Sequence, residues 1–118
     1  MARDTLVIQE LGNEGAQYDA AIAFTAMDAD NDLEVDNTGG NILIIIDNQH
    51  VAAQTATFVS VADGAGRTGD LALEVAAGKT AVVGPFTPTL WNQSDGMLHI
   101  DSADETTFNF AAVRYTPR

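Results

Sequence analysis

Residues 71–100 constrain the fold of this chain most, because they hold three short strand patterns and the turns between them. Apolar residues alternate with small or polar ones over residues 71–75, which is typical of a strand with one buried face. Gly78 follows at the point where a tight reversal needs a positive φ, and a second apolar run begins at Thr80. The pattern predicts a hairpin made of the strands 71–75 and 80–83.

Similar patterns and turn residues extend over the rest of the chain. Pro85 ends the second strand, because proline cannot donate a hydrogen bond to a sheet ladder. Further strands are predicted at residues 5–9, 18–27, 33–35, 41–47, 54–61, 97–100 and 107–115. The alanines in the segment 18–27 also permit a helical turn, but no convincing amphipathic helix occurs. The sequence predicts a single-domain, all-β antiparallel sandwich, with jelly-roll or immunoglobulin-like connectivity left open.

The predicted core is aliphatic, because hydrophobic residues make up 46% of the chain and aromatic residues only 7%. The unbroken apolar run at residues 42–46 predicts a central strand that is covered on both faces. Seven side chains are expected to be buried: Ile42, Ile44, Ile46, Phe58, Leu73, Val82 and Phe110.

Glycines separate the amino-terminal segment from the remainder of the chain. Leu6 and Ile8 lie on one face of an apolar stretch that is followed by Gly12 and Gly15. An apolar stretch of this kind is either an ordinary short strand or an arm that adds to the sheet edge of a neighbour. We therefore divide the chain into an arm or edge strand, residues 1–17, and a sandwich domain, residues 18–118.

Charge and composition exclude several classes of partner. The formal net charge is -12, from 17 acidic and 5 basic residues, and the basic residues are scattered, so neither nucleic acid nor an anionic membrane is an expected partner. The chain has no cysteine, which excludes disulfides and thiolate chemistry. The amino terminus lacks a signal-peptide pattern and no apolar run could cross a bilayer. We expect a soluble protein made in a cytoplasm without an encoded export step.

Carboxylates alternate along residues 28–36 with the spacing that begins a calcium-binding loop. The match fails at the sixth position, where such a loop needs glycine and this chain has Leu33, and at the twelfth, where Gly39 replaces glutamate. Two interpretations remain, a calcium site and a solvated acidic loop or strand edge. The candidate ligands are Asp28, Asp30, Asp32 and Asp36.

Other residue types that carry chemistry form no catalytic set. His99 lies between two apolar residues, which favours a strand histidine on a polar face or an interface, and His50 is expected to be exposed. Asp101 and Asp104 form a glycosidase-like pair on paper, which carries no weight without a cleft. Trp91 has three candidate roles: a core plug, a protein-interface anchor or a platform for a sugar. No enzyme activity is expected, and no cofactor other than calcium.

Three segments carry a resemblance to a known family. They are the strand at residues 41–48, the threonine-rich strand at 55–60, and the turn and strand at 75–80 followed by Gly-Pro-Phe and by the aromatic-Asn-x-x-Asp-Gly turn at Trp91. In this order the segments resemble the head decoration proteins of tailed bacteriophages, also called auxiliary capsid or cement proteins. The pattern covers residues 18–115, and the acidic stretch 28–36 departs from the simpler turn of that family.

The resemblance implies a non-enzymatic structural protein of the virion that binds the outside of the capsid and reinforces it against internal DNA pressure. It implies the major capsid protein as partner, and a homo-oligomer, with a trimer favoured, is the expected state. The candidate partner-binding residues are Leu6, Ile8, Arg67 and Trp91. The alternative is a small β-sandwich module that binds carbohydrate or calcium.

Overall fold

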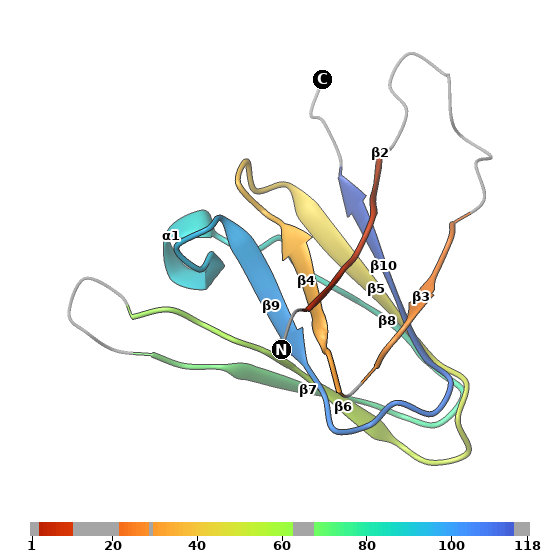
Figure 1. The fold of residues 1–118 in the computed structure, drawn as a ribbon. Helices are drawn as coiled ribbons and strands as arrows, with labels where there is room; N and C mark the ends of the chain where they lie inside the picture. The colour runs from red at the N-terminus through yellow and green to blue at the C-terminus, as the bar shows by residue number, and fades with distance from the viewer. Residues whose placement is uncertain (1–2, 11–21, 29, 63–67, 115–118) are drawn as a thin grey trace.

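The computed structural model of the chain is a sandwich of two β-sheets (Figure 1). It describes residues 3–10, 22–28, 30–62 and 68–114, apart from the side chain of Glu10. The first sheet, sheet A, has the order β1 (Asp4–Thr5), β4 (Leu33–Asp36), β9 (Met97–Asp101), β6 (Gln54–Phe58) and β7 (Leu71–Val75). The second sheet, sheet B, has the order β2 (Ile8–Glu10), β10 (Phe108–Arg114), β5 (Ile42–Asn48) and β8 (Thr80–Val83), with β3 (Thr25–Ala26) also paired to β10. The prediction of an all-β sandwich is confirmed.

Both sheets are mixed rather than wholly antiparallel. The pairs β1–β4 and β2–β10 are parallel, whereas the other paired strands are antiparallel. Both exceptions come from the amino-terminal segment, which runs along the edge of sheet A as β1 and then along the edge of sheet B as β2. No hairpin turn joins β1 to β4 or β2 to β10, so these pairs are not required to be antiparallel.

The core lies between the inner faces of the two sheets. Burial alternates along β5, where every second residue is buried, and the same alternation occurs in β4, β6 and β9. Five of the seven predicted core side chains are fully buried: Ile42, Ile44, Ile46, Phe58 and Phe110. The outer face of β5 is only half-covered, at Leu43 and Ile45, so this strand is interior to its sheet without being fully buried on both faces.

Two predicted core residues differ from expectation for one reason, which is that they lie on edge strands. Val82 is 62% exposed, because β8 ends sheet B and turns Ala81 and Val83 toward the core instead. Leu73, on the terminal strand of sheet A, packs against the core but is only half-buried. The prediction of burial was therefore wrong for Val82.

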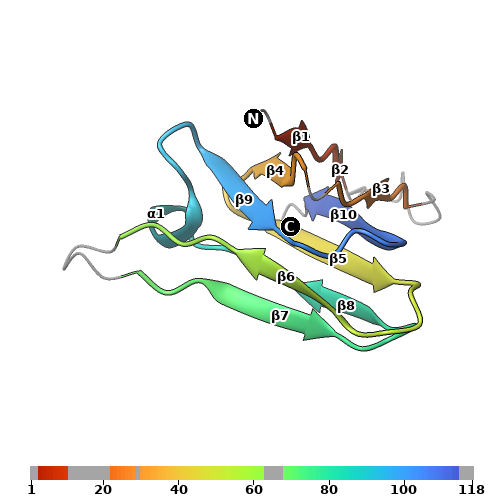
Figure 2. The ribbon, with the colours of Figure 1, turned by 60° about the horizontal axis from the view of Figure 1, so that its bottom comes forward.

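The strands β7 and β8 do not form the predicted hairpin. Gly78 does occupy the turn between them, with a φ of +71°. However, β7 pairs with β6 in sheet A and β8 pairs with β5 in sheet B, so the turn carries the chain from one sheet to the other (Figure 2). The alternation of residues identified each strand correctly but did not reveal its partner. The partner of β7 is β6 and the partner of β8 is β5, and both lie far from the Gly78 turn in the sequence.

Three smaller features complete the described structure. The predicted strand 18–27 is represented by β3 alone, and residues 18–21 lie outside the described residues. A single helical turn, α1 (Pro88–Trp91), lies between the predicted strands 80–83 and 97–100. Among the described residues, no helix is long and apolar enough to span a membrane.

Candidate functional site

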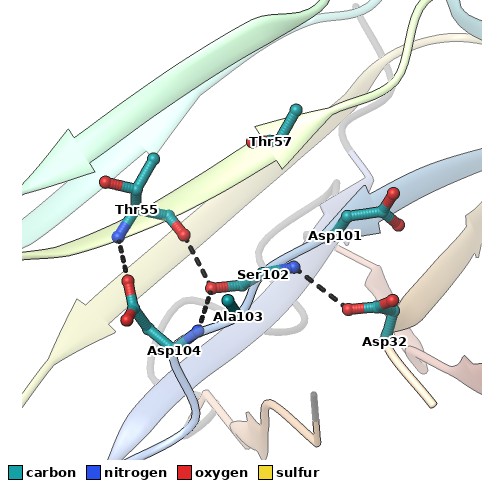
Figure 3. Close-up of a pocket in the computed structure, with 7 residues that line it drawn as sticks. All are labelled: Asp32, Thr55, Thr57, Asp101, Ser102, Ala103 and Asp104. Atoms are coloured by element: carbon teal, nitrogen blue, oxygen red, sulfur yellow. Dashed lines mark hydrogen bonds between the residues drawn. The ribbon is translucent and has the colours of Figure 1, made fainter. Parts of the chain in front are cut away.

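A pocket in the described part of the chain lies where β9 ends, beside β6 (Figure 3). Its volume is about 490 Å³, and its lining contains three carboxylates and three hydroxyl groups. The lining residues are Asp32, Thr55, Thr57, Asp101, Ser102, Ala103 and Asp104. Asp101 and Asp104 therefore line the same pocket. What the pocket can do depends on whether each of its polar groups is already hydrogen-bonded within the chain.

The polar groups of the pocket hold the segment after β9 against β6. Ser102 donates its hydroxyl to the carbonyl of Thr55 at 2.6 Å and accepts the backbone N–H of Asp104 at 2.9 Å. Asp104 in turn accepts the backbone N–H of Thr55 through Oδ2 at 2.9 Å (Figure 3). Because its hydroxyl is engaged by two backbone groups, Ser102 is placed as a structural residue rather than as a nucleophile.

The other two carboxylates also have structural partners. Asp32 accepts the backbone N–H of Ser102 at 3.0 Å, which ties the start of β4 to the end of β9. Asp101 forms an ion pair with Arg3, whose guanidinium also donates to the carbonyls of Leu33 and Ile100. The polar groups of the pocket thus hold β6, the start of β4 and the segment after β9 together. Asp32 and Asp104 accept hydrogen bonds, and Asp101 forms an ion pair, all with groups of the chain itself.

The structure does not gather the four candidate calcium ligands around one point. Asp28 accepts the backbone N–H of Asp30 within its own turn, and Asp32 faces Ser102. Asp36 lies at the far end of β4, about 13 Å from Asp32 at the usual rise per strand residue. The acidic stretch therefore has the form of a turn followed by a strand, with Asp32, Glu34 and Asp36 on the outer face of sheet A.

Two hydrogen bonds from Thr38 hold the carboxylate of Asp36. The hydroxyl of Thr38 donates to its Oδ1 at 2.6 Å and the backbone N–H of Thr38 at 3.0 Å. These two hydrogen bonds, the hydroxyl first, lower the pKa of Asp36 below its ordinary value. The positive charge of Arg114 lowers the pKa further, and slight burial opposes the shift.

The predicted partner-binding residues lie in different environments. Leu6 is 2% exposed and belongs to the hydrophobic core, so its side chain is not available to a partner while the segment stays in place. Ile8 is half-buried in β2 and packs against the same core. Arg67 lies outside the described residues. Trp91 is half-buried at the end of α1, and its ring meets the ring of Phe86 edge-on with centroids 5.3 Å apart, which is the geometry of a core plug.

A surface that sequence reasoning missed is the edge formed by β7 and β8, which we call the open edge. Each of these strands ends its sheet, and within the described residues each pairs with one neighbour only. The edge exposes Leu71 at 37% and Val82 at 62%. Charged residues and proline commonly flank natural edge strands, so Glu74, Lys79 and Pro85 were the signals that could have identified it.

Comparisons with known proteins returned no match for this chain. No family model matches it, and neither does any curated protein or solved structure.

Proposed function

We propose that this chain is a non-enzymatic structural protein of a tailed-phage virion, bound to the outside of the capsid through the open edge. The observation that carries the proposal is the contrast between the two edges of the sandwich, one closed by the amino-terminal strands and the other formed by two terminal strands. The resemblance of three segments to head decoration proteins supplies the identity of the partner, the major capsid protein.

The open edge offers main-chain groups for docking. In Figure 2, β7 and β8 lie at the same margin of the sandwich, in different sheets. Strand addition at such a margin uses backbone hydrogen bonds for affinity and needs no deep pocket. Val82 projects from the outer face of β8 and Leu71 begins β7, so apolar contacts would accompany the backbone pairing. An extended segment of the major capsid protein is the occupant that fits these features.

The charge of the chain supports a protein surface rather than DNA as the target. With a formal net charge of -12, the exterior repels polyphosphate and favours a basic patch on the partner. The polar groups of the pocket beside β9 hold loops in place, which also supports a structural role. The same proposal includes a homo-oligomer on the capsid surface, with a trimer favoured, and synthesis in the host cytoplasm before assembly.

The test is co-sedimentation of the purified chain with capsids that lack it, made from the major capsid protein of the same phage genome. We expect saturable binding by the unmodified chain and at least a tenfold weaker binding by Val82→Lys, because a charge on an edge strand opposes pairing. Val82 is 62% exposed, so this substitution should leave the urea midpoint unchanged.

Two matched variants distinguish the open edge from other surfaces. Val7→Lys changes a valine that is 71% exposed beside the amino-terminal strands, and Val51→Lys one that is 89% exposed after β5. Both should bind capsids like the unmodified chain. Loss of binding in Val7→Lys alone would move docking to the amino-terminal segment, and failure of the unmodified chain to bind would overturn the capsid proposal.

A further inference from the structure

Strand register brings a histidine and a glutamate together on the outer face of sheet A. Glu34 lies in β4 between the buried Leu33 and Val35, and His99 lies in β9 between the buried Leu98 and Ile100. The antiparallel register places Glu34 directly opposite His99. Because both neighbours of each residue point into the core, the two polar side chains must share the outer face.

The two side chains face each other without a hydrogen bond. His99 Nε2 and Glu34 Oε1 are 3.8 Å apart, which is too long for a hydrogen bond, and the side chains are only 22% and 23% exposed. Among the described residues, no other hydrogen bond engages either side chain. The half-buried imidazole and carboxylate therefore keep ligand atoms that no hydrogen bond from the described residues engages.

A second carboxylate completes the set from a rigid turn. Asp95 accepts the backbone N–H of Met97 through Oδ1 at 3.0 Å. The turn is closed by the hydrogen bond from Gly96 to Gln93 at 2.8 Å, and its glycine has a φ of +83°. One ligand atom from each of Glu34, Asp95 and His99 lies within 4.8 Å of the others. Asp95 is exposed, so a small rotation of its side chain can shorten these distances.

We propose that Glu34, Asp95 and His99 bind a divalent transition-metal ion of the zinc type. Tetrahedral zinc with nitrogen and oxygen ligands separates its donor atoms by about 3.4 Å, close to the distance between His99 and Glu34. An imidazole ligand favours zinc, nickel or copper over calcium and magnesium, which prefer oxygen ligands alone. Three protein ligands leave a coordination position open to water or to a ligand from a second molecule.

The test uses the tag-free chain, stripped with a chelator, and Zn²⁺ as the probe. We expect one-to-one binding by calorimetry and a rise in melting temperature that the chelator reverses, because an ion that binds only the folded state stabilises it. His99→Gln and Glu34→Gln should each abolish both effects while leaving the melting temperature of the metal-free chain close to that of the unmodified chain. Mg²⁺ and Ca²⁺ at the same concentration should produce no comparable rise.

The chain offers matched controls for both residue types. His50→Gln removes the other histidine, and Glu74→Gln removes a glutamate at the opposite end of the same sheet face, so both should bind Zn²⁺ normally. Nitrogen-15 spectra of the unmodified chain should show a zinc-dependent shift at the His99 ring, which needs no variant. The proposal fails if zinc binding persists in His99→Gln, if the His99 ring does not respond, or if Glu74→Gln weakens binding as much as Glu34→Gln.

Discussion

The two edges of the sandwich join the sheets in different ways. At the edge formed by β1 and β2, which we call the closed edge, one short segment lies along both sheets and buries a leucine between them. At the open edge, β7 and β8 are linked by a turn and leave their outer sides unpaired within the described residues. The contrast indicates that one edge is closed by chain that contributes to the core, whereas the other ends in two strands that each pair on one side only within the described residues.

At the closed edge, a buried apolar side chain is accompanied by hydrogen bonds and an ion pair to neighbouring strands. Leu6 is 2% exposed, and its backbone N–H donates to the carbonyl of Glu34 at 2.8 Å. Arg3 donates to the carbonyl of Leu33 at 3.1 Å and pairs with Asp101. The segment thus belongs to the fold of this chain, which is why an arm that detaches from a folded sandwich does not fit the geometry.

The open edge is held by a buried amide as well as by apolar contacts with the core. Asn48, at the end of β5, is fully buried and donates through Nδ2 to the carbonyl of Val75 in β7 at 2.9 Å. Its Oδ1 accepts the side-chain amide of Gln54 at 2.7 Å and the backbone N–H of His50 at 3.0 Å. One asparagine therefore adds directional hydrogen bonds between sheet B and the edge of sheet A to the apolar contacts that Val75 and Val83 make with the core.

The largest expected effect is at the closed edge. Leu6→Ala should lower the free energy of unfolding by about 2–5 kcal/mol, because it removes a buried side chain and leaves a cavity between the sheets. Urea denaturation measures the change. Val7→Ala is the control, since Val7 is 71% exposed and its truncation should alter stability by less than about 0.5 kcal/mol. If Leu6→Ala is as mild as Val7→Ala, the segment is a detachable arm after all.

A smaller loss is expected at the open edge. Asn48→Ala should lower the free energy of unfolding by about 1–3 kcal/mol, because the buried groups of Gln54 and Val75 lose their partner. Hydrogen exchange should become faster for amides of β7 and β8 than for those of β1 and β2. Gln49→Ala is the control, because Gln49 is exposed and bonds only to Asp47 through its side chain. Equal acceleration at both edges would show that Asn48 supports the whole core and not the open edge in particular.

The sequence predicted the strands well because alternation is a local property. The buried faces of β4, β6 and β9 follow directly from residues that alternate within each strand, whereas the unbroken apolar run of β5 predicted cover on both faces and only one face is fully buried. Partners are not local. The turn at Gly78 looks the same whether its two strands pair with each other or enter opposite sheets, and for this reason the hairpin prediction was wrong.

The candidate metal site also combines a local pattern, which the sequence shows, with a strand pairing, which it does not show. The alternating carboxylates drew attention to residues 28–36, but the chosen set left out Glu34, the one that faces a histidine. Glu34 and His99 are opposite each other only through the register of β4 with β9, which no local pattern reveals. Likewise, the apolar character of Leu6 was evident, whereas its burial depends on two edges formed by distant strands.

The smallest expected effect tests whether surface polar contacts beside the closed edge contribute to stability as Leu6 does. Two hydrogen bonds from Thr38 lower the pKa of Asp36 in the folded state, so this carboxylate stabilises the fold above its unfolded pKa, near the ordinary value of 3.8. That contribution is lost as the pH falls through the lower folded pKa. Asp36→Asn should therefore cost well under 1 kcal/mol at pH 7, because solvent screens an exposed carboxylate, and less at pH 2. Urea midpoints at both pH values measure the difference, with Thr38→Val as the matched variant that removes one of the two hydrogen bonds. A loss at pH 7 as large as that of Leu6→Ala would show that the closed edge depends on its surface turn as much as on its core.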